Sequence, residues 1–112
     1  MSDTTDNTAR HRLTSVRRWV IKVGSALLTN DGLGLDPLVM KTLTRQLASL
    51  HSLGHEVVLV SSGAIAAGLV RLNLPERPRE IHLSQAAAAV GQSALVRAYE
   101  DCLAPHGVMT AQ

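Results

Sequence analysis

An α/β fold built on a parallel sheet is predicted by three features of the sequence. Two short apolar runs rich in β-branched residues, at 19–23 and 57–60, are separated by a helix-like segment. Continuous apolar runs of this length are typical of strands that are buried on both faces of a parallel sheet. A second helix-like stretch follows the second run. The order strand, helix, strand, helix predicts a right-handed winding with parallel strands.

The first 15 residues are mostly Thr, Asp, Asn, Ser and Arg and offer almost nothing to bury. This composition predicts a flexible tail over 1–15 and one folded segment over 16–112. Asp3 and Asp6 argue against a transit peptide, because such peptides are poor in acidic residues. The first strand is then predicted from Trp19 to the residue before Gly24.

An amphipathic helix is predicted between the two strands. Asp36 and Pro37 supply an N-cap and a proline at the first helical position, and Gly54 supplies the stop. The polar segment 29–34 before them is predicted to be a loop. Apolar residues recur every three or four positions along the helix: Leu38, Val39, Leu43, Leu47 and Leu50.

The second half of the chain predicts two further helices. A helix of small residues is predicted at 64–69, directly after the second strand. A loop marked by two prolines follows it, and a long helix then runs to Leu103. Gly91 lies inside the long helix, where glycine costs about 1 kcal/mol relative to alanine. We therefore expect Gly91 to permit a close approach by another segment or by a ligand.

Residues 108–110 predict the start of a third strand. Two strands and a stub are fewer than a parallel α/β architecture normally uses. The chain is therefore expected to be the N-terminal part of a larger α/β domain, truncated at the third strand.

Composition excludes several classes of function. With 46% hydrophobic and 18% charged residues, the chain has the composition of a packed soluble protein. Aromatic residues make up 2% and the net charge is +2, so base-stacking platforms and a basic nucleic-acid surface are missing. No apolar stretch reaches the roughly 18 residues of a membrane span, and a cytoplasmic location is expected. Cys102, the single cysteine, fits a reducing compartment and an inert buried thiol.

The carboxyl ends of parallel strands lie at one edge of a sheet, which brings two distant segments together. Lys22, Gly24 and Ser25 end the first strand, while residues 62–64 follow the second strand and open a helix. Free N–H groups at a helix start and bare glycine backbone suit an anion. Lys22 is a lone charge in an apolar strand, and at about 4 Å from a phosphate oxygen it would contribute about 4 kcal/mol of attraction.

Simpler explanations exist for the same residues. Lys22 would also fit as a side chain that reaches water from the strand end or pairs with Glu56, and Ser62 as a plain N-cap. No Walker A motif or complete dinucleotide loop is present. His51 and His55 are four residues apart but have no third ligand nearby, so no metal site is predicted.

Three segments, 20–25, 57–68 and 85–92, together resemble the glutamate 5-kinase branch of the amino acid kinase family. The first reads VIKVGS, an element that many family members share. The other two contain SSGAIAAG and AVGQ, which point more specifically to this branch. The resemblance extends from residue 18 to the last residue. It implies a three-layer α/β/α sandwich with a mainly parallel sheet.

The resemblance also implies a reaction and a set of site residues. The reaction is transfer of the γ-phosphoryl group of ATP, with Mg²⁺, to the side-chain carboxylate of L-glutamate, giving L-glutamyl 5-phosphate on the route to proline. Lys22 is implied to be catalytic and to bind the ATP phosphates with Gly24 and Ser25. The implied glutamate-binding residues are Ser62, Gly63 and Ala64.

The family's remaining glutamate-binding and adenine-binding segments lie beyond the residues that match. We therefore expect the isolated chain to be inactive, this segment to have no nucleic-acid or membrane partner, and the complete enzyme to be a homo-oligomer. Two alternatives stay open from the residues. One is another amino acid kinase that acts on a different carboxylate or a carbamate, and the other is a noncatalytic remnant that binds anions.

Overall fold

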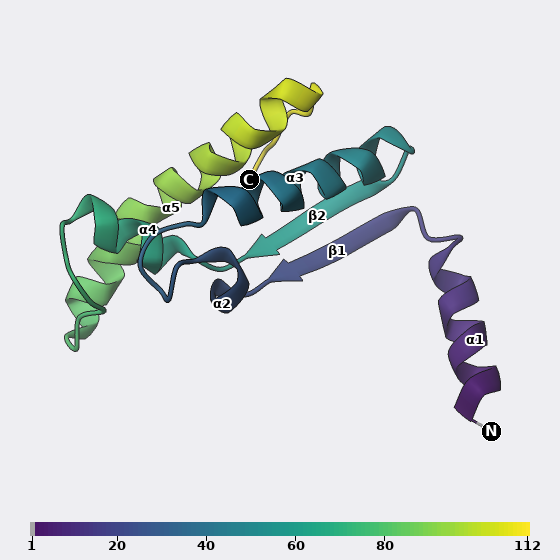
Figure 1. Cartoon of the computed structure of the whole chain (residues 1–112), viewed down its shortest axis with the longest axis horizontal. Coiled ribbons are helices and arrows are strands. Elements are labelled where there is room, and N and C mark those ends of the chain that lie inside the picture. Colours follow the sequence, from purple (N-terminus) through teal and green to yellow (C-terminus); the bar gives the residue numbers. More distant parts are fainter. Residues whose placement is uncertain (1) are drawn as a thin grey trace.

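Two parallel strands, covered on one face by helices, form the centre of the molecule (Figure 1). The computed structural model describes residues 2–112, with side chains from residue 7 onward. The elements in chain order are α1 (Ser2–Leu13), β1 (Arg18–Val23), α2 (Ser25–Leu28), α3 (Pro37–Ser52), β2 (Glu56–Ser61), α4 (Ala64–Arg71), α5 (Ile81–Leu103) and the 3₁₀ turn η1 (Ala104–His106). The predicted α/β class with parallel strands is confirmed.

Strands β1 and β2 pair in parallel, from Arg18 opposite Glu56 to Val23 opposite Ser61. Their inner face packs against core residues of α3 and α5. Their outer face is open, since Val20 is 67% exposed and Val60 is 48% exposed. The prediction that both faces are buried is therefore wrong for the described residues. An apolar run predicts a strand, but it does not say whether the helices that follow pack on one face or on both.

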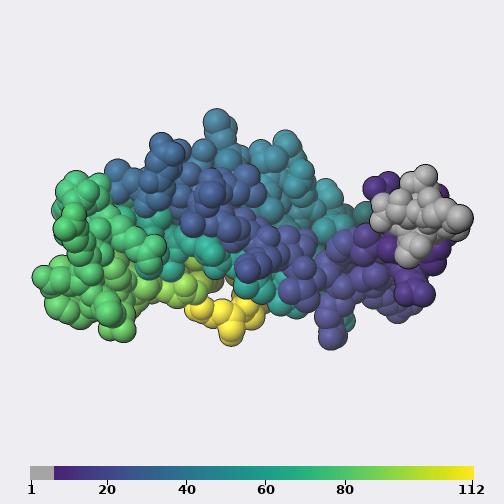
Figure 2. Space-filling model, turned by 90° about the horizontal axis from the view of Figure 1, so that it is seen from below, coloured from purple at the N-terminus to yellow at the C-terminus, as the bar shows by residue number. Residues whose placement is uncertain are grey.

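Helix α1 occupies the stretch for which a flexible tail was expected. Its described side chains, from Asn7 to Leu13, are all exposed, so it adds no apolar area to the core. Basic residues fill its last turn, where they interact favourably with the negative end of the helix dipole. Figures 1 and 2 show α1 standing at one end of a body that measures 50 × 38 × 23 Å. The composition correctly excluded burial there, although it did not exclude a local helix.

Helix α3 forms where the cap and the periodicity predicted it. The Asp36 carboxylate accepts hydrogen bonds from the N–H groups of Leu38 and Val39 at 3.0 and 3.4 Å. Pro37 occupies the first helical position, and Gly54 follows the helix with a φ of +89°.

The single turn α2 was not predicted. It is held by Leu28, whose side chain is fully buried, and it ends in a bridge between Thr29 and Leu35. A lone helical turn has no periodicity to detect in a sequence, and burial of one leucine explains why this turn forms.

Helices α4 and α5 cross with their backbones in direct contact. A Cβ atom on Gly91 would lie 1.6 Å from the carbonyl oxygen of Ala64, and one on Gly68 would lie 1.8 Å from that of Ala87. No side chain larger than hydrogen fits at either position. The expectation that Gly91 permits a close approach is confirmed, and the approaching group is α4.

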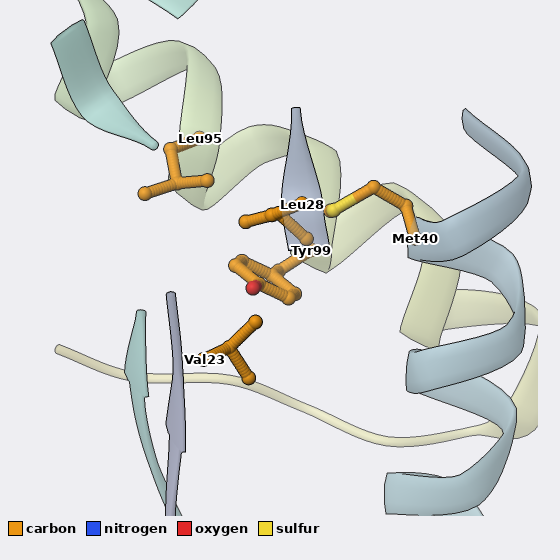
Figure 3. Packing of buried hydrophobic residues seen from close by; sticks show 5 residues of the cluster. All are labelled: Val23, Leu28, Met40, Leu95 and Tyr99. Atoms are coloured by element: carbon orange, nitrogen blue, oxygen red, sulfur yellow. The ribbon is translucent and has the colours of Figure 1, made fainter. Parts of the chain in front are cut away.

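Two apolar clusters form the core between the sheet and the helices. The larger cluster is shown in Figure 3 and contains Val23, Leu28, Met40, Leu95 and Tyr99. The smaller cluster contains Leu47, Ala48 and Leu103. No helix in residues 2–112 combines the length and the apolar character that crossing a membrane requires.

The predicted third strand does not form in the described part of the chain. Residues 107–112 have no regular structure, and the Val108 N–H donates to the carbonyl of Leu103 at 3.3 Å. The Val108 side chain packs on the smaller core cluster. A strand requires a neighbouring edge for its backbone groups, and here the chain turns back onto α5 instead.

Candidate functional site

The carboxyl ends of β1 and β2 lie side by side, as the sequence predicted. The Ser62 N–H donates to the carbonyl of Val23 at 2.9 Å, so the pairing continues one residue beyond β2. The chain enters α2 directly after β1 and α4 shortly after β2, and both helices lie at the same rim of the sheet (Figure 1).

An open pocket of about 680 Å³ lies at this rim. Its volume falls within the range of roughly 300 to 1,000 Å³ that is usual for small-molecule sites. Four of the predicted site residues line it together: Ser25, Ser62, Gly63 and Ala64. The structure therefore brings the two distant segments to one cavity.

Gly63 shapes the turn between β2 and α4. Its φ of +110° lies in the left-handed region, which L-residues with a side chain rarely adopt. A Cβ atom there would also lie 3.2 Å from the Leu35 side chain and 3.3 Å from that of Leu28. Within residues 2–112, no hydrogen bond uses the Gly63 N–H. The first turn of α4 adds further N–H groups without helical partners, and residues 64–66 line the pocket.

Ser62 is exposed at the pocket and does not cap α4. The N-cap position belongs to Gly63, and the helix has no side-chain cap. The Ser62 hydroxyl has no hydrogen-bond partner among the described residues. The simpler explanation of Ser62 as an N-cap is therefore wrong, and its hydroxyl is free to bind a ligand.

Lys22 lies at the same rim but not in the pocket. Its side chain is exposed, and in register it lies opposite Val60 on the open face of the sheet. Glu56, considered above as a partner of Lys22, pairs instead with Arg18 at 2.7 Å. Lys22 forms no ion pair with the described side chains, those of residues 7–112, and its side chain is exposed to solvent. A Cβ atom on nearby Gly24 would meet nothing within 4 Å, so the space beside the strand end is open.

Three charged pocket residues were not singled out from the sequence: Asp31, Glu76 and Arg77. Asp31 belongs to the turn 30–34, where its φ is +53°. Arg77 is the one Lys or Arg side chain among the described residues that line this pocket. Charged loop residues are ordinarily solvated, and only the folded chain shows that these loops border a cavity.

Sequence reasoning also missed a hydrogen bond beneath the turn. The hydroxyl groups of Ser61, at the end of β2, and Tyr99, on α5, lie 2.6 Å apart. Burial raises the pKa of the Tyr99 phenol above its ordinary value of 10.0. The phenol therefore stays neutral at every physiological pH.

We expect Tyr99 to ionise at a higher pH in the folded chain than in the chain unfolded by urea. Because the folded pKa exceeds the unfolded one, the stability due to the neutral phenol is complete below about pH 10 and is lost as the pH rises through the folded pKa. Tyr99 is the single tyrosine of the chain, so ultraviolet absorbance of tyrosinate reports on it alone. Identical titration curves in the two states would contradict this expectation.

His55 has an ordinary structural role. The Trp19 Nε1–H donates to its Nδ1 at 3.3 Å, and the two rings meet edge to face with centroids 6.1 Å apart. Among the side chains of residues 7–112, no group of three or more His, Cys, Asp or Glu is arranged to hold a metal ion.

The sequence is similar to known phosphotransferases. The model of the amino acid kinase family matches residues 17–112. A glutamate 5-kinase of Azoarcus sp. (strain BH72) is 55% identical over 103 residues, and one of Saccharophagus degradans is 58% identical over 96 residues. These alignments cover 92% and 86% of this chain but 28% and 26% of the two relatives. The chain thus spans little more than a quarter of the length of the curated relatives it matches.

Proposed function

This chain belongs to the amino acid kinase family, and we propose that it supplies part of the active site of an ATP-dependent glutamate 5-kinase. The reaction is phosphorylation of the side-chain carboxylate of L-glutamate to L-glutamyl 5-phosphate, a step toward proline. The observation that best supports the proposal is the pocket at the sheet rim, which Ser25, Ser62, Gly63 and Ala64 line together.

The residues at the rim suit two anionic substrates. The free Ser62 hydroxyl and the Gly63 N–H are hydrogen-bond donors for the carboxylate of glutamate, and Ala64 continues this surface into α4. Gly24 and Ser25 offer backbone and hydroxyl donors to the ATP phosphates, and Lys22 offers a positive charge from the open face. A carboxylate oxygen attacks the γ-phosphorus while the bond to the leaving ADP oxygen breaks. Such a transfer depends on positioning and charge neutralisation rather than on a covalent protein intermediate.

The pocket residues also fit the Mg²⁺ that accompanies ATP. Asp31 and Glu76 both line the pocket and would hold the ion, since Mg²⁺ is commonly bound by one or two carboxylates together with phosphate oxygens. When bound, the ion would neutralise phosphate charge. The cytoplasmic location expected from the sequence and the homo-oligomeric assembly implied by the family resemblance both stay predictions.

A hybrid enzyme tests the proposal. In it, this chain replaces the matching part of the Azoarcus relative, and release of ADP is measured with L-glutamate, ATP and Mg²⁺. We expect the hybrid to turn over and the isolated chain to be inactive, because the chain spans only 28% of that relative. L-Aspartate, which is one methylene shorter, serves as the matched control substrate and should react more slowly.

Three outcomes would contradict the proposal or narrow it. A folded hybrid that binds ATP but releases no ADP would favour a noncatalytic anion-binding module. A preference for another carboxylate or for a carbamate would favour a different branch of the family. Turnover by the isolated chain would show that its residues form a complete site.

A further inference from the structure

A chain of hydrogen bonds connects the core helix α5 to the turn that borders the pocket. Tyr99 is buried in the larger core cluster, where its ring lies with Leu28 and Val23 (Figure 3). Its hydroxyl lies 2.6 Å from the Oγ of Ser61, and that Oγ lies 2.9 Å from the carbonyl oxygen of Ser62. A buried tyrosine hydroxyl requires a partner, and here the partner directly precedes the turn.

The number of available hydrogens shows which group donates in each of these hydrogen bonds. The Ser61 hydroxyl has a single hydrogen, and the Ser62 carbonyl can only accept, so the hydrogen of Ser61 points to Ser62. Tyr99 must then donate its own hydrogen to Ser61. The raised pKa of Tyr99 keeps that hydrogen in place.

Holding the Ser62 carbonyl sets the orientation of the next amide. The peptide group between Ser62 and Gly63 is planar and trans, so the Gly63 N–H points opposite to the Ser62 carbonyl and therefore away from Ser61. Gly63 itself gives little conformational restraint, because glycine reaches many φ and ψ values at low cost. The hydrogen bond from Ser61 therefore restrains the peptide group between Ser62 and Gly63, which Gly63 alone does not fix.

We propose that Tyr99 and Ser61 are positioning residues that hold the Ser62 hydroxyl and the Gly63 N–H in the orientation that receives the substrate carboxylate. Neither side chain lines the pocket, so both act through the backbone of the turn. The identity of the ligand in this inference rests on the proposed function. The geometry of the turn is independent of that function.

The kinetic test uses the hybrid enzyme with Tyr99→Phe, Ser61→Ala and the two changes combined. Each single variant is expected to raise the KM for glutamate roughly five- to tenfold, with kcat and the KM for ATP changing by less than about twofold. The double variant should resemble either single variant, because the hydrogen-bond chain is already broken once. Ser61→Thr retains the hydroxyl and should restore the KM. Unchanged KM values, or effects of the single variants that multiply in the double variant, would overturn the proposal.

A matched control separates positioning from stability. Leu103→Ala removes a buried side chain of the smaller core cluster, away from the turn, and should lower the unfolding midpoint without changing the KM for glutamate. If this control raises the KM as much as Tyr99→Phe does, the effect is general destabilisation and the proposal fails.

A second measurement does not depend on catalysis. Hydrogen exchange at the Ser62 amide, whose N–H donates to the Val23 carbonyl at 2.9 Å, should be faster in the Tyr99→Phe hybrid than in the unchanged hybrid when followed by NMR, while exchange within α3 stays the same. Should the hybrid prove inactive, the proposed function fails, and this amide still decides whether Tyr99 positions the turn. Equal exchange rates at Ser62 would overturn the inference even in an active hybrid.

Discussion

Gly91→Ala is expected to destabilise the fold by about 3 kcal/mol or more, or to prevent folding altogether. The new methyl group would lie 1.6 Å from the Ala64 carbonyl oxygen and 2.5 Å from the Gly68 nitrogen, and both are backbone atoms. Alanine favours a helix over glycine by only about 1 kcal/mol, so the clash outweighs this gain. No side-chain rotation can relieve the overlap, and α4 must move away from α5.

The measurement is the midpoint of urea unfolding of the hybrid, followed by circular dichroism, together with the yield of soluble protein. Gly24→Ala is the matched control, because Gly24 has a φ of −84° and a methyl group there meets nothing within 4 Å. This control should leave the unfolding midpoint nearly unchanged. A Gly91→Ala variant as stable as the control would show that the two helices do not cross as closely as described.

Lys22→Ala is expected to lower the kcat of the hybrid by roughly 100- to 1,000-fold, the usual effect of removing one group that stabilises developing charge. The KM for glutamate should change much less, since Lys22 does not line the pocket that carries the proposed glutamate contacts. Stability should also change little, because Lys22 is exposed and makes no ion pair with any side chain that the structure describes.

Two further variants control for charge and for position. Lys22→Arg keeps the positive charge and should retain more activity than the alanine variant. Lys41→Ala removes an exposed lysine of α3 that does not line the pocket, and it should leave kcat unchanged. If Lys22→Ala proves as fast as Lys41→Ala, the ammonium group of Lys22 takes no part in the transfer.

Local signals in the sequence predicted the elements that depend on local chemistry. The cap at Asp36 and the spacing of leucines predicted α3, and the glycine inside α5 predicted a close crossing. The number of covered sheet faces, the turn α2 and the absence of a strand at 108–110 were not predictable in this way. Each of them depends on which surfaces meet after the chain has folded.

The same distinction applies to the candidate site. The parallel winding predicted that Ser25 and Ser62 would share one rim, and they line one pocket. The hydrogen bond between Ser61 and Tyr99 joins residues 38 positions apart, and the sequence pattern did not predict it. The place of Arg77 in the pocket lining likewise depends on a loop conformation that composition does not determine.

The contact between the backbones of α4 and α5 has a consequence for ligand selection. No side chains separate the two helices at Gly68 and Gly91, so the backbone of α4 packs directly on that of α5 and cannot shift toward it. A bulkier acid could not widen this cavity by pushing on its wall unless the 23 residues of α5 moved as well. In the proposed kinase this rigid wall would limit the size of the acid that fits, and admitting a larger acid would require changes in the loops at 31–33 and 75–77, which also line the pocket.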